Sequence, residues 1–153
     1  MIIEPGEEPR IMDKPIVTEE VKKDLEENFR HLVNPVKIAV FTKDGINDQY
    51  NKIAKQLIGE VAAVSDKLSV EFHEIGDKAS RKYGVERSPS ILIAPDRFSI
   101  RFTGTPLGEE GRTLVLALIL ASTARAPMLK PEFSSRIEDL KEKRDVRVFV
   151  SPT

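Results

Sequence analysis

The chain has 153 residues, enough for one domain with a substantial core, and its 24 basic and 25 acidic residues leave a formal net charge of −1. Because the two signs are interleaved along the chain, we find no field of one charge that would attract nucleic acid or anionic lipid. The sequence contains no cysteine, which excludes disulfides, thiolate metal sites and thiol redox chemistry in this chain as it stands.

The distribution of apolar residues predicts a cytoplasmic protein. Residues 1–17 are Pro-rich and acidic and lack the apolar core of a signal peptide, so we expect a loose leader. The longest apolar run, Leu114–Ala121, is far shorter than the ~20 residues that cross a bilayer, which predicts a buried helix and no membrane partner. The 32% of charged residues, the absent cysteine and the 10 prolines favour a thermophilic source.

The first elements along the chain are a helix and a buried strand. Thr18 is a candidate N-cap with Glu19 and Glu20 in the first turn. The helix that follows places apolar residues on one face at Val21, Leu25, Phe29 and Leu32. Residues 36–41 are apolar except for Lys37, a pattern typical of a central strand covered on both faces.

A turn and the clearest helix of the chain come next. Residues 43–45 form the turn, and the helix begins at Asn47 or Asp48, with Asp48 as the expected cap. Its apolar positions recur at helical spacing at Tyr50, Ile53, Leu57, Val61 and Val64.

The remaining elements of this region alternate between strands and helices. Residues 68–73 predict a strand with one buried side formed by Leu68, Val70 and Phe72. A short helix over 78–83 is closed by Gly84, and a hairpin pairs residues 91–93 with 98–103. A final helix covers 109–122. The order predicts an α/β fold in which a parallel pair and an antiparallel hairpin share one mixed four-stranded sheet between helices.

The chain then starts the same pattern again. The apolar positions of the first helix and the strand-like run from Val40 reappear 108 positions later. The helix positions are Val21, Leu25, Phe29 and Leu32, which recur as Leu129, Phe133, Ile137 and Leu140, and the run recurs from Val148. A constant offset of this size is what two copies of one structural unit would produce. We therefore divide the chain into a leader (1–17), a first unit (18–123), a linker (124–131) and the leading helix and first strand of a truncated second unit (132–153).

Several segments carry a resemblance to a known group of proteins. These segments are Asn34–Val36, Ser65–Leu68, Ser88–Ser90, Arg101–Gly108, Leu114–Leu118 and Asp145–Thr153. The sequence resembles proteins built from two tandem thioredoxin-like units, each preceded by an extra helix, such as archaeal protein disulfide oxidoreductases and the N-terminal domain of the flavoprotein component of alkyl hydroperoxide reductase. The resemblance implies a thioredoxin-like three-layer fold with an extra N-terminal helix.

The resemblance also implies where a redox site would lie. In that group the second unit carries Cys-x-x-Cys directly after the turn that reads Val148 to Thr153 here, so the chain would end one residue before it. Through the 108-residue offset, Ile46 and Gln49 occupy the equivalent cysteine positions of the first unit. Neither side chain can form a thiolate, so we interpret this turn as vestigial.

A proline opens the strand of the hairpin. The resemblance implies that the Ser88–Pro89 bond is cis and that Ser88 and Pro89 form a docking edge for an extended peptide. The alternative is that Pro89 only begins a strand, and a cis bond here can also be an inherited constraint of the fold.

Other candidate sites favour structural roles. His31 and His73 lack metal-binding spacing, and residues 104–108 precede Glu109 and Glu110, which would repel a phosphate. The helix over 113–121 is apolar on every side, which predicts an interface built from Leu116, Ile119 and Leu120, together with the strand residues Val148 and Val150. Alternatively, Leu25, Phe29 and Phe133 cover this helix within the chain.

These observations lead to one main functional prediction and one alternative. The chain is expected to be the redox-inactive half of a tandem thioredoxin-like module, with no cofactor of its own, and FAD and NADH belong to the parent protein if it carries a flavin domain. Expected partners are the second unit, and a peroxiredoxin or a flavin domain. The alternative is a non-catalytic adaptor that binds peptides or forms a homodimer through its unpaired strand.

Overall fold

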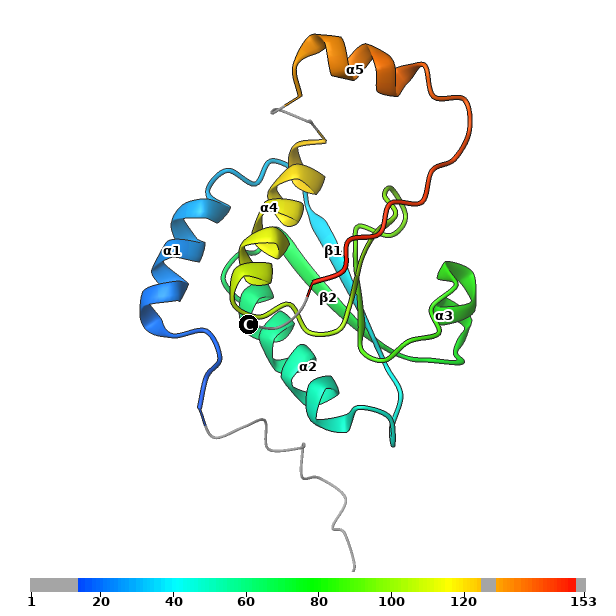
Figure 1. Ribbon diagram of the computed structural model, residues 1–153. Helices are drawn as coiled ribbons and strands as arrows, with labels where there is room; N and C mark the ends of the chain where they lie inside the picture. Colours follow the sequence, from blue (N-terminus) through cyan, green and yellow to red (C-terminus); the bar gives the residue numbers. More distant parts are fainter. Residues whose placement is uncertain (1–13, 125–128, 151–153) are drawn as a thin grey trace, which may run out of the picture.

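A four-stranded mixed sheet forms the centre of the computed structural model, which describes residues 14–124 and 129–150 (Figure 1). The strands are β1 (Val36–Thr42), β2 (Leu68–Glu74), β3 (Ser90–Ile93) and β4 (Ile100–Thr103), in the spatial order β2-β1-β3-β4. The β1 and β2 strands are parallel, whereas β3 pairs antiparallel with both β1 and β4. The predicted sheet is therefore confirmed.

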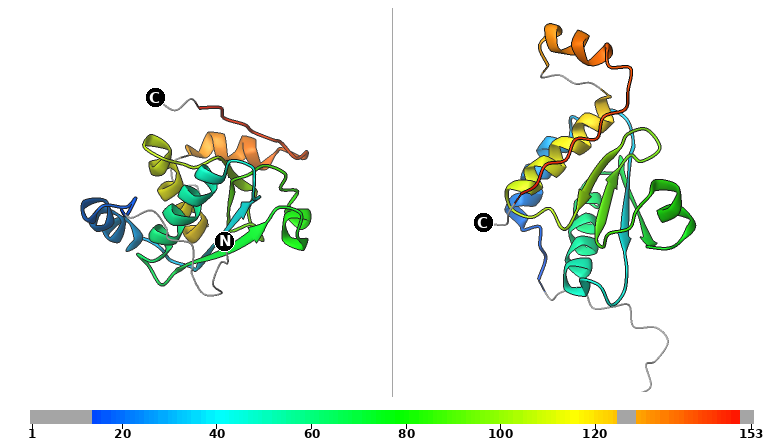
Figure 2. Two further views of the ribbon diagram at one scale, coloured as in Figure 1. Left: turned by 90° about the horizontal axis from the view of Figure 1, so that it is seen from below. Right: turned by 45° about the vertical axis from the view of Figure 1, so that its right-hand side comes forward.

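Helices lie on both faces of this sheet, and one further helix lies apart from it (Figure 1). The helices of the described residues are α1 (Glu19–Phe29), α2 (Asp48–Ala62), α3 (Lys78–Tyr83), α4 (Glu109–Thr123) and α5 (Pro131–Glu138). Helices α2 and α4 lie on one face with α1 outside them, while α3 lies alone on the other face (Figure 2). The predicted three-layer arrangement with an extra N-terminal helix is confirmed.

Strand β1 is buried on both sides because its residues are apolar on both sides. Val36, Ile38 and Val40 belong to the larger core, together with residues of α1, α2 and α4. Phe41 points the other way, into a smaller core that includes Val85 and is packed by Tyr83 of α3. The two cores explain why this strand shows no alternation in sequence.

Two predicted helix boundaries are confirmed, the start of α1 and the end of α3. Thr18 is the N-cap of α1 and its side chain accepts a hydrogen bond from the Val21 N–H at 3.3 Å. Gly84 ends α3 in the left-handed conformation, with φ of 60°, which glycine adopts without steric cost.

A cluster of charged groups fastens α3 to the hairpin. The Asp96 carboxylate accepts hydrogen bonds from Lys82 at 2.8 Å and from the Tyr83 hydroxyl at 2.6 Å, and it lies 3.0 Å from the Lys37 ammonium. These three donors, with Lys82 the strongest, hold the pKa of Asp96 well below its usual range.

Strand β2 departs from its prediction. Leu68 is buried and Val70 is half-buried, but Phe72 is 50% exposed, so the expected buried side does not extend along the whole strand. The reason is position in the sheet: β2 pairs only with β1 and lies at the edge, where less of the neighbouring structure covers it.

The C-terminal region forms a helix but no strand. Helix α5 lies apart from the sheet, and the extended segment that follows it returns past the first unit (Figures 1 and 2). The strand predicted to open the second unit is not formed in this chain: residues 146–150 belong to no strand, and Val148 is 82% exposed. A strand requires a hydrogen-bonding neighbour, and the sheet of the described residues does not include this segment.

Some predictions fall on residues that the structure does not describe. These are most of the leader (1–13), the central part of the linker (125–128) and the final residues (151–153). Within the described part of the chain, no helix is both long and apolar enough to cross a lipid bilayer.

Candidate functional site

Two segments far apart in sequence meet at one end of the sheet. The turn over residues 43–47 follows β1, and Ser88 and Pro89 precede β3, which is antiparallel to β1. Hydrogen bonds from Lys43 and Asn47 join the turn to Ser88. The Ser88–Pro89 peptide bond is cis, as the resemblance implied.

The two predicted vestigial positions are both exposed: Ile46 lies in the turn and Gln49 in the first turn of α2. Asn47 between them adopts the left-handed conformation, with φ of 58°, which asparagine tolerates better than most residues. The predicted cap at Asp48 is wrong, because Asn47 is the N-cap residue and Asp48 is the first residue of α2. The Asp48 carboxylate instead reaches back into the turn and accepts a hydrogen bond from the Gly45 N–H at 2.8 Å.

A buried pair of side chains lies beneath this turn. The Ser88 hydroxyl accepts a hydrogen bond from the Lys43 N–H at 2.7 Å and donates one to Asn51 Oδ1 at 2.8 Å. Ser88 and Asn51 are both buried. Because a buried polar group without a partner is costly, these bonds stabilise the arrangement.

The Asn51 amide completes the connection. Its Nδ2 donates to the Lys43 carbonyl at 3.0 Å and to the Ile46 carbonyl at 2.8 Å. On the outside, Asn47 Nδ2 donates to the Ser88 carbonyl at 2.7 Å. We call Lys43, Asn47, Asn51 and Ser88 the turn network; it links β1, the start of α2 and the segment before β3.

The sequence did not lead us to predict Asn47 or Asn51 as residues of the candidate site. A signal for Asn51 was present, because Ala54 and Ile58 follow it at helical spacing and both are fully buried. An asparagine on such a buried face needs hydrogen-bond partners, which points to a structural or functional role. The partners themselves lie on other elements, so the spacing could not name them.

The side chains of the turn network are donors and acceptors bonded to one another, and none of them is an activated nucleophile. In the described ranges, no three His, Cys, Asp or Glu side chains are grouped so that they could hold a metal ion. The chemistry that this arrangement supports is rigid positioning of the turn.

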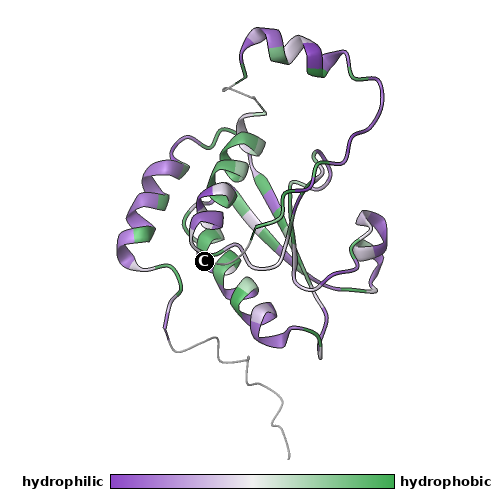
Figure 3. Cartoon of the chain, in the orientation of Figure 1, coloured by the Kyte–Doolittle hydropathy of each residue, from purple (hydrophilic) through white to green (hydrophobic). Residues whose placement is uncertain are grey.

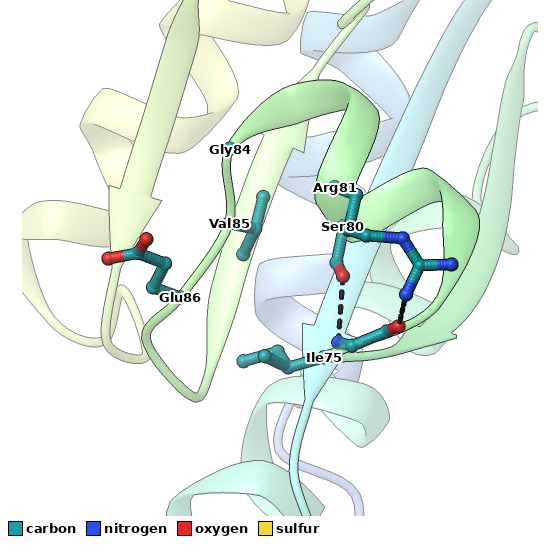
Figure 4. Close-up of a pocket in the computed structure, with 7 residues that line it drawn as sticks. Ile75, Ser80, Arg81, Gly84, Val85 and Glu86 are labelled. Atoms are coloured by element: carbon teal, nitrogen blue, oxygen red, sulfur yellow. Dashed lines mark hydrogen bonds between the residues drawn. The ribbon is translucent and has the colours of Figure 1, made fainter.

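A hollow lies beside α3, away from the turn network (Figure 4). It is lined by Ile75, Gly76, Ser80, Arg81, Gly84, Val85 and Glu86. The Ser80 hydroxyl accepts from the Gly76 N–H at 2.8 Å, and Arg81 donates to the Gly76 carbonyl. Glu86 points away from these groups (Figure 4). The polar groups of this hollow therefore serve the loop that contains them, and the hollow shares no residue with the turn network.

The residues of α4 that were predicted to form an interface are only partly exposed to solvent. This helix is apolar over most of its length (Figure 3). Leu116 is 45% exposed, but Ile119 and Leu120 are half-buried. Leu25 and Phe29 of α1 belong to the same buried core as α4, so α1 supplies part of the cover within the chain. The other interface residues, Val148 and Val150, are exposed beyond α5.

The two histidines lie apart from the turn network. His31 is exposed after α1. His73 is half-buried, stacks on Phe41 at 5.0 Å between ring centroids, and contacts Asp77 at 3.1 Å and Glu71 at 3.3 Å. The loop over 104–108 ends at Gly108, which is the N-cap of α4.

Comparison with known proteins relates the chain to two groups. No model of a known protein family matches it. The F subunit of alkyl hydroperoxide reductase (AhpF) from Staphylococcus aureus is 27% identical over 133 residues, which are 85% of this chain and 24% of that protein. The chain thus spans about a quarter of the length of the curated relatives that it matches.

Two solved structures share the fold. AhpF of Enterococcus faecalis superposes with a TM-score of 0.69 and 24% identity, covering 80% of this chain and 60% of that one. A protein disulfide oxidoreductase from Aeropyrum pernix superposes with a TM-score of 0.65 and 23% identity, covering 82% and 56%. The chain therefore has the thioredoxin-like fold that these two structures share, and its sequence is similar to that of AhpF.

Proposed function

We propose that this chain is the redox-inactive half of a tandem thioredoxin-like module and that it scaffolds a second unit. The dithiol of that second unit would relay electrons between a flavin disulfide centre and a protein disulfide such as that of a peroxiredoxin. The observation that carries this proposal is the pair Ile46 and Gln49, which occupy the two positions where the resemblance places cysteines. The hydrogen bonds of the turn network hold this region in place without a cysteine.

The chemical argument concerns the start of α2. A thioredoxin-type site needs a thiolate at a helix N-terminus, where unpaired N–H groups and the helix dipole lower the thiol pKa. Ile46 is a hydrocarbon and Gln49 is a neutral amide, so neither can attack a disulfide. The turn is also fastened from within by Asn51 and Ser88. These features support a scaffold role.

The apolar stripe of α5 supports the presence of a second unit. In α1, Leu25 and Phe29 are only 6% and 4% exposed because they pack into the larger core. Their counterparts 108 residues later, Phe133 and Ile137, are 47% and 52% exposed. A stripe of the same character requires a comparable apolar surface, which the second unit would provide. In the same unit Val146–Val150 would gain a strand partner.

Three tests bear on the proposal. An insulin-reduction assay on this chain should show no turnover, and measurable turnover would contradict redox inactivity. The coding sequence after Thr153 should continue with Cys-x-x-Cys and a helix. In a longer version of the chain, hydrogen exchange at Phe133, Ile137 and Val148 should slow markedly; an immediate stop codon, or unchanged exchange in the longer version, would contradict the scaffold role.

A dimerising adaptor is the second candidate, favoured by the exposed apolar residues near the C-terminus. Val146, Val148 and Phe149 are 84%, 82% and 87% exposed, and such segments pair readily with another chain. Light scattering on purified protein distinguishes the two candidates. A dimer that dissociates in Phe149→Asp, but not in the exposed-loop control Val33→Asp, would favour the adaptor, whereas a monomer would remove it.

A further inference from the structure

Strand β2 leaves one edge of the sheet open. It pairs with β1 on one side, and among the described residues no strand lies beside its other side. The Lys67 carbonyl and the Ile75 N–H, just outside the two ends of β2, both bond to β1. Because backbone groups alternate in direction along a strand, the even-numbered residues between them direct their N–H and C=O groups outward. Such an unpaired row is a template for another strand.

The open edge also carries exposed apolar side chains. Phe72 is 50% exposed, and Val70 on the same face of the sheet is half-buried. The strand at the opposite edge, β4, has four residues, and its Phe102 is half-buried. Strand β2 has seven residues, so it offers the longer and more exposed edge.

A second copy of this chain fits the edge by symmetry. An antiparallel pair of β2 strands, related by a two-fold axis perpendicular to the sheet, places the outward backbone groups of the two copies opposite each other. The corresponding helices of both copies then lie on the same side of one continuous sheet. Because α2 lies over β1 and β2, the two α2 helices would be roughly 10 Å apart, a distance at which helices pack without collision.

Side-chain chemistry favours one register of this pair. With Phe72 opposite Phe72 of the second copy, two exposed aromatic rings meet on the axis. On both sides of the axis, Glu71 of one copy then faces His73 of the other, so that a carboxylate acceptor lies beside an imidazole. The edge is therefore complementary to itself in both apolar and polar character.

The two neighbouring registers oppose like charges. With Glu71 on the axis, its carboxylate faces the same carboxylate of the second copy. With Val70 on the axis, Asp66 of one copy comes opposite Glu74 of the other. Like charges directly opposite each other destabilise a sheet, so neither register competes with the one centred on Phe72.

We propose that two copies of this chain pair through β2, antiparallel and with Phe72 on the two-fold axis. A single pair of short strands buries less surface than a permanent interface does, so the dimer is weak and depends on concentration. The interface shares no residue with Val146–Val150. It requires neither a second thioredoxin-like unit nor redox inactivity.

Sedimentation velocity over a range of concentrations tests the dimer. Phe72→Glu places two carboxylates on the axis and should weaken association at least about tenfold. Leu107→Glu is the control, since Leu107 is a similarly exposed apolar residue in the loop before α4, and it should associate as the unchanged chain does. Circular dichroism verifies that each variant is folded. A chain that stays monomeric throughout, or a dimer that persists in folded Phe72→Glu, would overturn the proposal.

The absence of cysteine allows a second test that retains the unchanged charges. Cα atoms of directly opposed residues lie about 5.5 Å apart in a hydrogen-bonded pair, within the range of a disulfide. Under mild oxidation Phe72→Cys should therefore form a covalent dimer faster than Val70→Cys, Glu71→Cys or the control Leu107→Cys. Fastest cross-linking at position 70 or 71 would overturn the register, and no excess over the control would overturn the dimer.

These outcomes are separate from those of the proposed function. Phe149→Asp, which tests association through the C-terminal residues, should leave the β2 dimer intact. The insulin-reduction assay and the coding sequence after Thr153 report on the scaffold role and not on β2. Either proposal can therefore fail while the other stands.

Discussion

The hydroxyl of Ser122 donates a hydrogen bond to the carbonyl of Asn34 at 2.6 Å, across 88 residues of sequence. The same hydroxyl accepts the Val33 and Asn34 N–H groups at 2.7 and 2.9 Å, and Asn34 Nδ2 donates to the Ser122 carbonyl at 2.9 Å. This reciprocal set fastens the loop before β1 to the last turn of α4. It therefore fixes where the central strand enters the sheet relative to the helix that covers it.

Replacing Ser122 with alanine should destabilise the fold by about 1–3 kcal/mol, because the Val33 N–H and the Asn34 carbonyl lose their partner and the Asn34 N–H keeps only the Ser122 carbonyl at 3.3 Å. Urea unfolding followed by circular dichroism measures the change. Ser135→Ala is the control, since that exposed hydroxyl bonds only to the Glu132 carbonyl within α5. Equal urea midpoints for Ser122→Ala and the unchanged chain would contradict the role given to Ser122.

Replacing Asn51 with alanine should cost about 2–3 kcal/mol, because Asn51 satisfies the Ser88 hydroxyl and two carbonyls in a buried setting. Hydrogen exchange should accelerate over residues 43–51 more than elsewhere. Asn28→Ala, on the exposed face of α1, should leave both quantities nearly unchanged. If hydrogen exchange in Asn51→Ala accelerated equally across the protein, Asn51 would not be the residue that holds the turn.

The repeat offers a matched pair of apolar positions. Phe29→Ala should cost about 3–5 kcal/mol because it leaves a cavity in the larger core. Ile137→Ala, at the position 108 residues after Phe29, should change the unfolding free energy by less than about 0.5 kcal/mol because its side chain is half exposed. Thermal and urea unfolding measure both. A large loss in Ile137→Ala would mean that α5 packs against the first unit in solution.

Asp77, the N-cap residue of α3, should make the free energy of unfolding depend on pH. The Ser80 N–H, which donates to the Asp77 carboxylate at 2.6 Å, and then His73 lower the pKa of Asp77. Because the folded pKa lies below the unfolded one, the contribution is present above the unfolded pKa of about 4 and is lost as the pH falls through the folded pKa. The substitution Asp77→Asn keeps a side-chain oxygen that can cap the helix but removes this titration.

The measurement is therefore a difference between two unfolding curves. The stability advantage of the unchanged chain over Asp77→Asn should shrink as the pH is lowered from 6 toward about 2, the range over which carboxylates titrate. Asp66→Asn, at an exposed loop position, is the control for general charge effects. An advantage that grows on acidification would show the opposite sign and reject the assignment.

The sequence by itself determined the elements and their layering. The alternation of β4, the unbroken apolar run of β1, the cap at Thr18 and the left-handed end at Gly84 are local signals, because period and cap chemistry act within a few residues. The position of the candidate turn followed from the resemblance to tandem thioredoxin-like proteins, carried to the first unit through the 108-residue offset.

Only the tertiary structure decided which groups meet at that turn. Asn51 and Ser88 are 37 residues apart and Asn47 and Ser88 are 41 apart, so their hydrogen bonds exist only once β1 and β3 are paired. Position in the sheet likewise left Phe72 exposed at an edge, and the apolar run Val146–Val150 formed no strand within the described chain. Local patterns specify what a segment can become, but a hydrogen bond or a buried face also requires a partner that the rest of the fold must supply.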